Sequence, residues 1–196
     1  MWAEFAPLAL FVFAGLFSPG PNVILLTASG ARFGFRPTLP HVAGVAAGVG
    51  VIAAVTALGV GAVLLAQPRL TLALQAVAAG WILWMAWKLA TAARAAKATA
   101  GDRPWGFGRA VLFQWVNPKV WAIALAASAG FSAGLPPMQE AARLATAFSG
   151  INLGVCLFWS FAGSLLTWLL TTPRAWRLFN GAMAAALALS AALVFL

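Results

Sequence analysis

Acidic residues are almost missing from this chain, which has three Asp and Glu residues against twelve Lys and Arg residues in a length of 196. Only 8% of the residues are charged, whereas a soluble domain carries about 25%. So few charges cannot cover a surface that faces water. Together with 63% hydrophobic residues, this scarcity indicates an integral membrane protein.

A basic tract is missing as well, although the formal net charge is +9. The basic residues stand one or two at a time between apolar runs. This pattern is typical of the inside loops of a membrane protein and not of a phosphate-binding patch. We therefore expect a lipid bilayer as the surroundings and no nucleic acid as a partner.

Residues for metal and redox chemistry are scarce. Cys156 is the single cysteine and His41 the single histidine, so no intramolecular disulfide and no CxxC pair can form. No acidic residue occurs between Phe5 and Gly101. The sequence predicts neither a metal site nor a cofactor. It also argues against a membrane enzyme or an electron carrier, which need catalytic groups or haem ligands.

Long apolar runs dominate what is present, and a spanning helix needs about 20 such residues. Six segments qualify: 5–31, 39–66, 70–90, 109–131, 141–170 and 175–196. Alternating strands of the β-barrel type are not visible. The predicted fold is an all-α integral membrane protein with six transmembrane helices.

The basic residues also predict an orientation. With the N-terminus outside, the inside loops hold Arg32, Arg36, Arg94, Lys97, Arg103, Arg109, Arg174 and Arg177. The outside loops then keep only Arg69 and Arg143, together with Glu4 and Glu140, as the positive-inside rule favours. If the first segment re-enters the membrane instead of spanning it, five spans and an inside N-terminus result.

Two of the six segments are interrupted, and at matching places. Residues 1–100 and 101–196 hold three segments each, within one membrane domain. The first segment of each half is broken, at Ser18-Pro-Gly-Pro-Asn22 and at Asn117-Pro-Lys119. Three spans per half require the second half to insert upside down, so the halves are predicted inverted repeats. Such matching interruptions are the best sequence indication of a transporter's binding site.

The breaks expose polar backbone in an apolar medium. A broken helix leaves up to four N–H and four C=O groups without partners, so a break inside a bilayer must line a protein cavity. Pro118 suits the first turn of a helix and Asn117 its N-cap. Pro21 is expected to begin the second part of the first segment, with Gly20 supplying backbone freedom. Two ordinary proline kinks are the alternative.

These motifs resemble those of one family. Ser18-Pro-Gly-Pro-Asn22, the GxRxGxR pattern of 30–36 and Gln114-x-x-Asn117-Pro-Lys119 are similar to the LysE/RhtB family of amino-acid exporters, over essentially the whole chain. The stretch 152–163 is similar to the cysteine and O-acetylserine exporters of that family. The resemblance implies export of amino acids or related metabolites across the bacterial inner membrane, driven by the proton gradient. The residues that fall on the family's motifs are Pro19, Gly20, Pro21, Asn22, Asn117, Pro118 and Lys119.

Four polar side chains stand out among the apolar segments. Lys119 is expected near mid-membrane, where an ammonium is costly and usually functional; the alternative is a lysine that snorkels to the interface. Gln114 and Asn152 would contact the substrate or simply bond to a neighbouring helix. His41, whose ordinary pKa lies near neutrality, is the candidate for proton coupling, or an interfacial histidine without a role.

The sequence therefore predicts a secondary transporter that works by alternating access around the two breaks, with an amino acid or a derivative as its small-molecule substrate. The expected substrate-binding residues are Pro19, Gly20, Pro21, Asn22, Gln114, Asn117, Pro118, Lys119 and Asn152. A helper subunit without transport activity, or an exporter of another small solute, are the alternatives. Two small-xxx-small steps, Gly44 to Gly48 and Gly150 to Gly154, would serve a homodimer or internal packing.

Overall fold

The computed structural model describes residues 2–60, 63, 66–91, 102–166 and 168–192, and these residues form helices and turns without any strand. The helices are α1 (Trp2–Phe17), α2 (Pro21–Phe33), α3 (Phe35–Val55), α5 (Pro68–Thr91), α6 (Phe107–Trp115), α7 (Pro118–Gly130), α8 (Pro137–Leu166) and α9 (Pro173–Ala192). A short π-helical turn, η1 (Thr56–Val60), continues α3. The predicted helical class is thus confirmed.

Three helical stretches of the described chain are long and apolar enough to cross a membrane, namely Phe35–Val60, Pro68–Thr91 and Pro137–Leu166. The count rises to five if each of two bent pairs forms one span: α1 with α2, bent by 60°, and α6 with α7, bent by 65°. The two predicted breaks are therefore present. The described part of the sixth predicted segment lies in α9, which is not one of these long apolar stretches, so the six-span inverted repeat stays a prediction.

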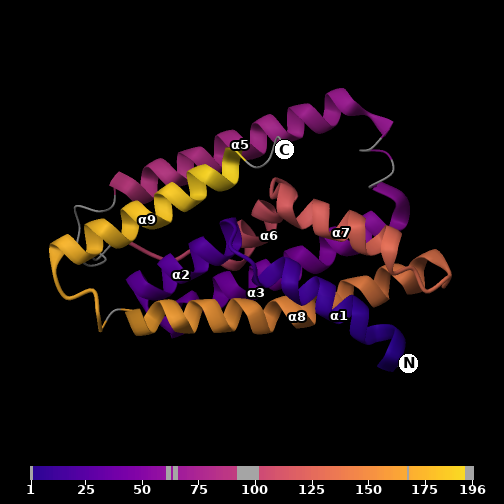
Figure 1. The fold of residues 1–196 in the computed structure, drawn as a ribbon, viewed down its shortest axis with the longest axis horizontal. Helices are drawn as coiled ribbons and strands as arrows, with labels where there is room; N and C mark the ends of the chain where they lie inside the picture. The colour runs from indigo at the N-terminus through magenta and orange to yellow at the C-terminus, as the bar shows by residue number, and fades with distance from the viewer. Residues whose placement is uncertain (1, 61–62, 64–65, 92–101, 167, 193–196) are drawn as a thin grey trace.

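The helices form a main bundle and a flanking pair, which packs against α2 and α6 of the bundle. In the bundle, α3 packs against α8 and α6, while α8 also contacts α1 and α2; α5 and α9 lie side by side along the other side of the molecule (Figure 1). The end of α5, the α2–α3 turn and the α8–α9 connection gather at the left end of the view. Of the charged residues predicted in loops, Arg94 and Lys97 lie outside the described residues, as does the side chain of Glu4. Gly101, between the two predicted halves, also lies outside them.

Glycines allow the bundle helices to touch backbone to backbone. A Cβ on Gly30 would collide with the Ser160 carbonyl oxygen, and one on Gly163 would collide with that of Thr27, which locks α2 onto α8. In a bilayer, where lipid is as apolar as the helix surface, such close packing holds helices together. The exposed faces are correspondingly apolar; Leu10, for example, is 70% exposed.

The two small-xxx-small steps behave differently. Gly44 and Gly48 pack internally against α6, where added Cβ atoms would meet the Phe107 carbonyl oxygen and, at 2.6 Å, Cγ of Gln114. Gly150 and Gly154 have no atoms of the structure within 4 Å of such a Cβ. Internal packing thus explains the first step, and only the second leaves a surface for a homodimer.

Candidate functional site

The two helix breaks lie next to each other, joined by a pair of amides. Asn22 Nδ2 donates to Gln114 Oε1 at 2.8 Å, and Gln114 Nε2 donates back to Asn22 Oδ1 at 3.1 Å. Asn22 belongs to the first turn of α2 and Gln114 to the last turn of α6. This reciprocal pair therefore connects the two halves of the chain at their interruptions.

Lys119 makes the second connection. Its Nζ donates to the Ser18 carbonyl oxygen at 2.6 Å, to Ser18 Oγ at 2.8 Å and to the Pro19 carbonyl oxygen at 3.1 Å. These carbonyls follow the end of α1, where the helix dipole places partial negative charge. The ammonium is thus fully engaged, because its Nζ donates to three acceptors of the first break.

Gly20 is needed for a different reason than the sequence suggested. Its φ of 177° is extended backbone, which any residue can adopt, so conformational freedom does not explain the glycine. Instead, a Cβ at this position would lie 2.9 Å from both Cδ and Nζ of Lys119. The missing side chain leaves room for the lysine to reach the break.

Asn117 occupies the N-cap position of α7, but its side chain makes no capping bond, contrary to expectation. Its Nδ2 points toward Gln114 Oε1, at 3.4 Å. Since Gln114 Oε1 is an acceptor, Asn117 must turn its NH₂ toward it and its carbonyl oxygen away. That oxygen, Oδ1, is buried and has no hydrogen-bond partner among the described residues.

Asn152 completes the group from α8. It is 2% exposed, and its Nδ2 is buried without a hydrogen-bond partner in the described part of the chain. Together with Gly20, Asn22, Asn117 and Lys119 it lines a hollow of about 10 Å³, the central cavity. Unpaired buried polar groups cost about 1–3 kcal/mol each. The lining residues thus include one unused acceptor, Asn117 Oδ1, and one unused donor, Asn152 Nδ2, which a ligand with both kinds of group would satisfy.

The remaining predicted residues have other positions. Pro21 and Pro118 begin α2 and α7, and neither helix start has a side-chain cap. Pro118 faces a separate hollow, beside Trp115 and Trp121. His41 does not line the central cavity: it is 2% exposed and lies against Trp105, with ring centroids 5.2 Å apart.

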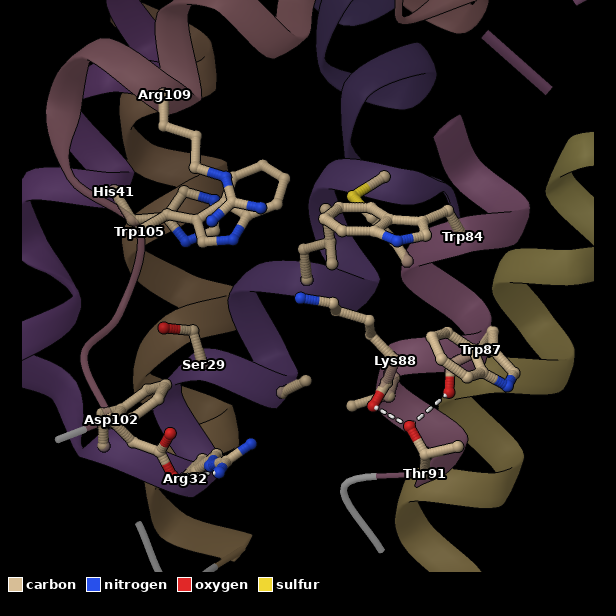
Figure 2. A pocket seen from close by; sticks show the side chains of 15 residues that line it. Ser29, Arg32, His41, Trp84, Trp87, Lys88, Thr91, Asp102, Trp105 and Arg109 are labelled. Carbon is tan, nitrogen blue, oxygen red and sulfur yellow. Dashed lines mark hydrogen bonds and ion pairs between the residues drawn. The ribbon is translucent and has the colours of Figure 1, made fainter. Parts of the chain in front are cut away.

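Sequence reasoning missed two parts of this arrangement. Ser18 binds Lys119 through both its carbonyl and its hydroxyl, yet only its presence in the SPGPN motif signalled a role. The chain also forms a larger cavity, of about 500 Å³, around His41, Trp105 and Arg109 (Figure 2). The arginines there were interpreted only as loop charges that set orientation.

An apolar helical bundle in which two interrupted helices meet around a small polar cavity is an architecture of secondary transporters. The fold and the site therefore indicate the class of membrane transport proteins. The comparison with family models agrees, because the model described as LysE type translocator matches residues 13–196. The chain belongs to this LysE family.

Individual relatives are moderately similar. The cysteine/O-acetylserine efflux protein of Salmonella typhimurium (strain LT2) is 32% identical over 153 residues, which is 76% of either chain. The protein of the same name from Klebsiella pneumoniae is 30% identical over 151 residues, again 76% of each. No solved structure matches the chain at a significant level.

Proposed function

We propose that this protein exports a small neutral amino acid or a close derivative from the bacterial cytoplasm across the inner membrane. Family membership supports transport over the enzyme alternative. The relatives named for cysteine and O-acetylserine efflux favour a small zwitterionic substrate. The single observation that carries the proposal is the meeting of the two breaks around unpaired Asn117 Oδ1 and Asn152 Nδ2.

The chemistry of this site suits a zwitterion. The substrate ammonium would bind Asn117 Oδ1 and the carbonyls at the end of α1, which carry partial negative charge. The substrate carboxylate would bind Asn152 Nδ2, the uncapped N–H groups that begin α2 and α7, and the ammonium of Lys119. Both ends of the substrate are then satisfied without an unpaired buried charge.

Substrate binding must open the central cavity. Its volume of about 10 Å³ is about that of a single water probe, and an amino acid is several times larger. We infer that the substrate carboxylate takes over Lys119 from the carbonyls of Ser18 and Pro19. One set of charge-assisted hydrogen bonds then replaces another, so the breaks can separate at small net cost. Alternation of the two halves, as inverted repeats, would follow.

The proton gradient is the proposed energy source, and few described groups within the helices can exchange a proton. Glu140 is engaged with Arg143 at 2.5 Å near the start of α8. Asp102 is engaged with Arg32 at 2.5 Å outside the helices. His41 and Lys119 therefore remain the candidates for proton coupling within the spans.

The test is efflux of labelled amino acids from cells with and without the protein, over a panel that includes cysteine, O-acetylserine, serine and lysine. We expect faster efflux of one or more of the small neutral compounds. If no compound of the panel leaves faster, the helper-subunit alternative replaces this proposal. If only lysine leaves faster, the transport class holds and the assignment to a small neutral substrate is wrong.

A further inference from the structure

The larger cavity lies at a different place from the central cavity. It has a volume of about 500 Å³ and is formed where α2, α3, α5, α6 and the segment before α6 come together. We call it the Trp105 vestibule, after its lining residues Ser29, Arg32, His41, Lys88, Trp105 and Arg109. Figure 2 shows Arg109, His41 and Trp105 on one wall, with Lys88 reaching in from the opposite wall.

The vestibule is positively charged. Its described lining contains three basic residues and one acidic residue, a net charge of +2. Arg32 is paired with Asp102, whereas Arg109 and Lys88 lie on indole faces, 4.3 Å from the Trp105 ring and 4.5 Å from the Trp84 ring. Contact with an indole holds a cation in place without neutralising its charge. Two positioned cations thus face the cavity.

His41 provides a second, independent sign of a ligand. Although it is only 2% exposed, neither ring nitrogen has a hydrogen-bond partner among the described residues. A neutral imidazole carries one donor and one acceptor, and buried polar groups are rarely left unpaired. The vestibule wall therefore contains an unused polar group directly beside the Trp105 ring.

The vestibule adjoins the central cavity through two helices. Helix α6 carries both Arg109 of the vestibule and Gln114 of the break region. Helix α2 likewise carries both Ser29 of the vestibule and Asn22 of the break region. Phe113, which follows Arg109 and precedes Gln114 on α6, is 2% exposed and packs edge-on against Trp105, with ring centroids 5.6 Å apart. The Trp105 ring of the vestibule is thus in contact with the helix that carries Gln114.

We propose that the Trp105 vestibule is a second binding site, where the carboxylate of the substrate first docks from the cytoplasm on Arg109 and Lys88. The ligand class is a small zwitterion or monoanion with a free carboxylate; amino acids with a net positive charge are disfavoured by the field of the site. A lipid phosphate would meet the same two cations, and the experiment below distinguishes the two sources of the anionic group. This inference rests on the proposed export function and on its orientation.

A cysteine-protection experiment tests the site. In a Cys156→Ala background, Ser29→Cys places a thiol in the vestibule and Ser132→Cys places a control thiol in the α7–α8 turn. We expect a membrane-impermeant methanethiosulfonate reagent to label Ser29→Cys in inside-out but not in right-side-out vesicles. O-acetylserine should slow this labelling severalfold, and its methyl ester, which lacks the carboxylate, should not; Ser132→Cys should show no protection.

A kinetic arm covers the case in which the cysteine variant fails to fold. In proteoliposomes, Arg109→Gln should raise KM for the substrate on the cytoplasmic side about tenfold, since charge focusing of this kind changes association by about 10–10³-fold. The maximal rate should change less than twofold. Arg103→Gln removes the same charge outside the vestibule and should leave KM unchanged.

Three results would overturn the inference: protection by the methyl ester equal to that by O-acetylserine, an equal KM for Arg109→Gln and Arg103→Gln, or labelling that is slowed by phosphatidylglycerol vesicles and no further by O-acetylserine. The last result would assign the site to a lipid headgroup. Failure of the export proposal can be distinguished from failure of this inference. In the first case the wild-type protein moves no compound of the panel, while the labelling experiment still reports on carboxylate binding in the vestibule.

Discussion

The central cavity and the Trp105 vestibule differ in nearly every physical property. The first has about 10 Å³ and is surrounded by hydrogen-bonded amides, a lysine and helix ends. The second has about 500 Å³ and is bordered by cations and indoles. A narrow cavity in which most polar groups are hydrogen-bonded suits the step that moves the substrate across the membrane. A wide, charged cavity suits the initial binding of the substrate. The comparison predicts that changes at the breaks alter the maximal rate and that changes in the vestibule alter KM.

The largest effect is expected for Lys119→Ala. This change removes three hydrogen bonds to the first break and the proposed partner of the substrate carboxylate. Efflux should fall at least about 100-fold, in line with the functional weight of charges inside membranes, while the protein remains in the membrane. Labelled-substrate efflux together with an immunoblot of membrane fractions checks this; unchanged efflux would show that the break works without the lysine.

Gly20→Ala should have the next largest effect. The added Cβ would lie 2.9 Å from Cδ and Nζ of Lys119, so the lysine has to move away from the break. We expect a maximal rate about tenfold lower, since small misplacements in a site are costly, with KM less affected. Gly154→Ala is the matched control, because its Cβ would meet open space. Equal rates for both variants would remove the steric argument.

The Asn22–Gln114 pair should show coupling in a double-mutant cycle. Gln114→Ala leaves the half-buried Asn22 amide without this partner, and Asn22→Ala takes one donor and one acceptor from the buried Gln114 amide, which keeps its bond to the Ala110 carbonyl oxygen; a lost partner of a buried polar group costs about 1–3 kcal/mol. The double variant should be less destabilised than the sum, with a coupling of about 1 kcal/mol. Thermal unfolding in detergent measures all four proteins, and strict additivity would mean that the reciprocal bonds contribute little to joining the halves.

His41→Gln should have the smallest effect. The substitution keeps a donor and an acceptor beside Trp105 but loses the ring contact, so KM should rise about threefold, of the order of one weak polar contact. The maximal rate should not change if the vestibule only recruits substrate. Efflux that no longer depends on an imposed proton gradient would instead assign His41 to coupling and would end the division of roles between the two cavities.

Much of the local structure was predictable. Proline suits the first turn of a helix and is costly in the interior, and Pro21 and Pro118 mark the starts of α2 and α7. Proline alone does not end a helix here, because Pro7 and Pro40 lie inside α1 and α3; at the two breaks it is accompanied by Gly20 or Asn117. The bounds of α3 were less accurate: it begins at Phe35 and not at residue 39, because Arg36 and Pro37 are tolerated in a first turn. The positions of the breaks could therefore be derived from local rules.

The site could be predicted only in part. Lys119, Gln114 and Asn152 stood out because polar groups are expensive inside a membrane, while Asn22 and Asn117 fell on the family's motifs. The pairing of these residues did not follow from the sequence, because the facing direction of a helix depends on packing against neighbours distant in the chain. Ser18 and the walls of the vestibule belong to this second kind, as does the requirement for Gly20, which depends on where Lys119 reaches.

The sequence by itself determined that this is a helical membrane protein with two interrupted segments, because hydrophobic length and proline chemistry act within one stretch of chain. Only the tertiary structure decided that Lys119 binds the first break, that Asn22 and Gln114 exchange hydrogen bonds, and that His41 borders a separate cavity. The hydrogen bonds join residues about a hundred positions apart in the chain. The ring contact joins His41 and Trp105, which are more than sixty positions apart. Nothing local encodes them, since they arise from the close approach of helices that glycines permit.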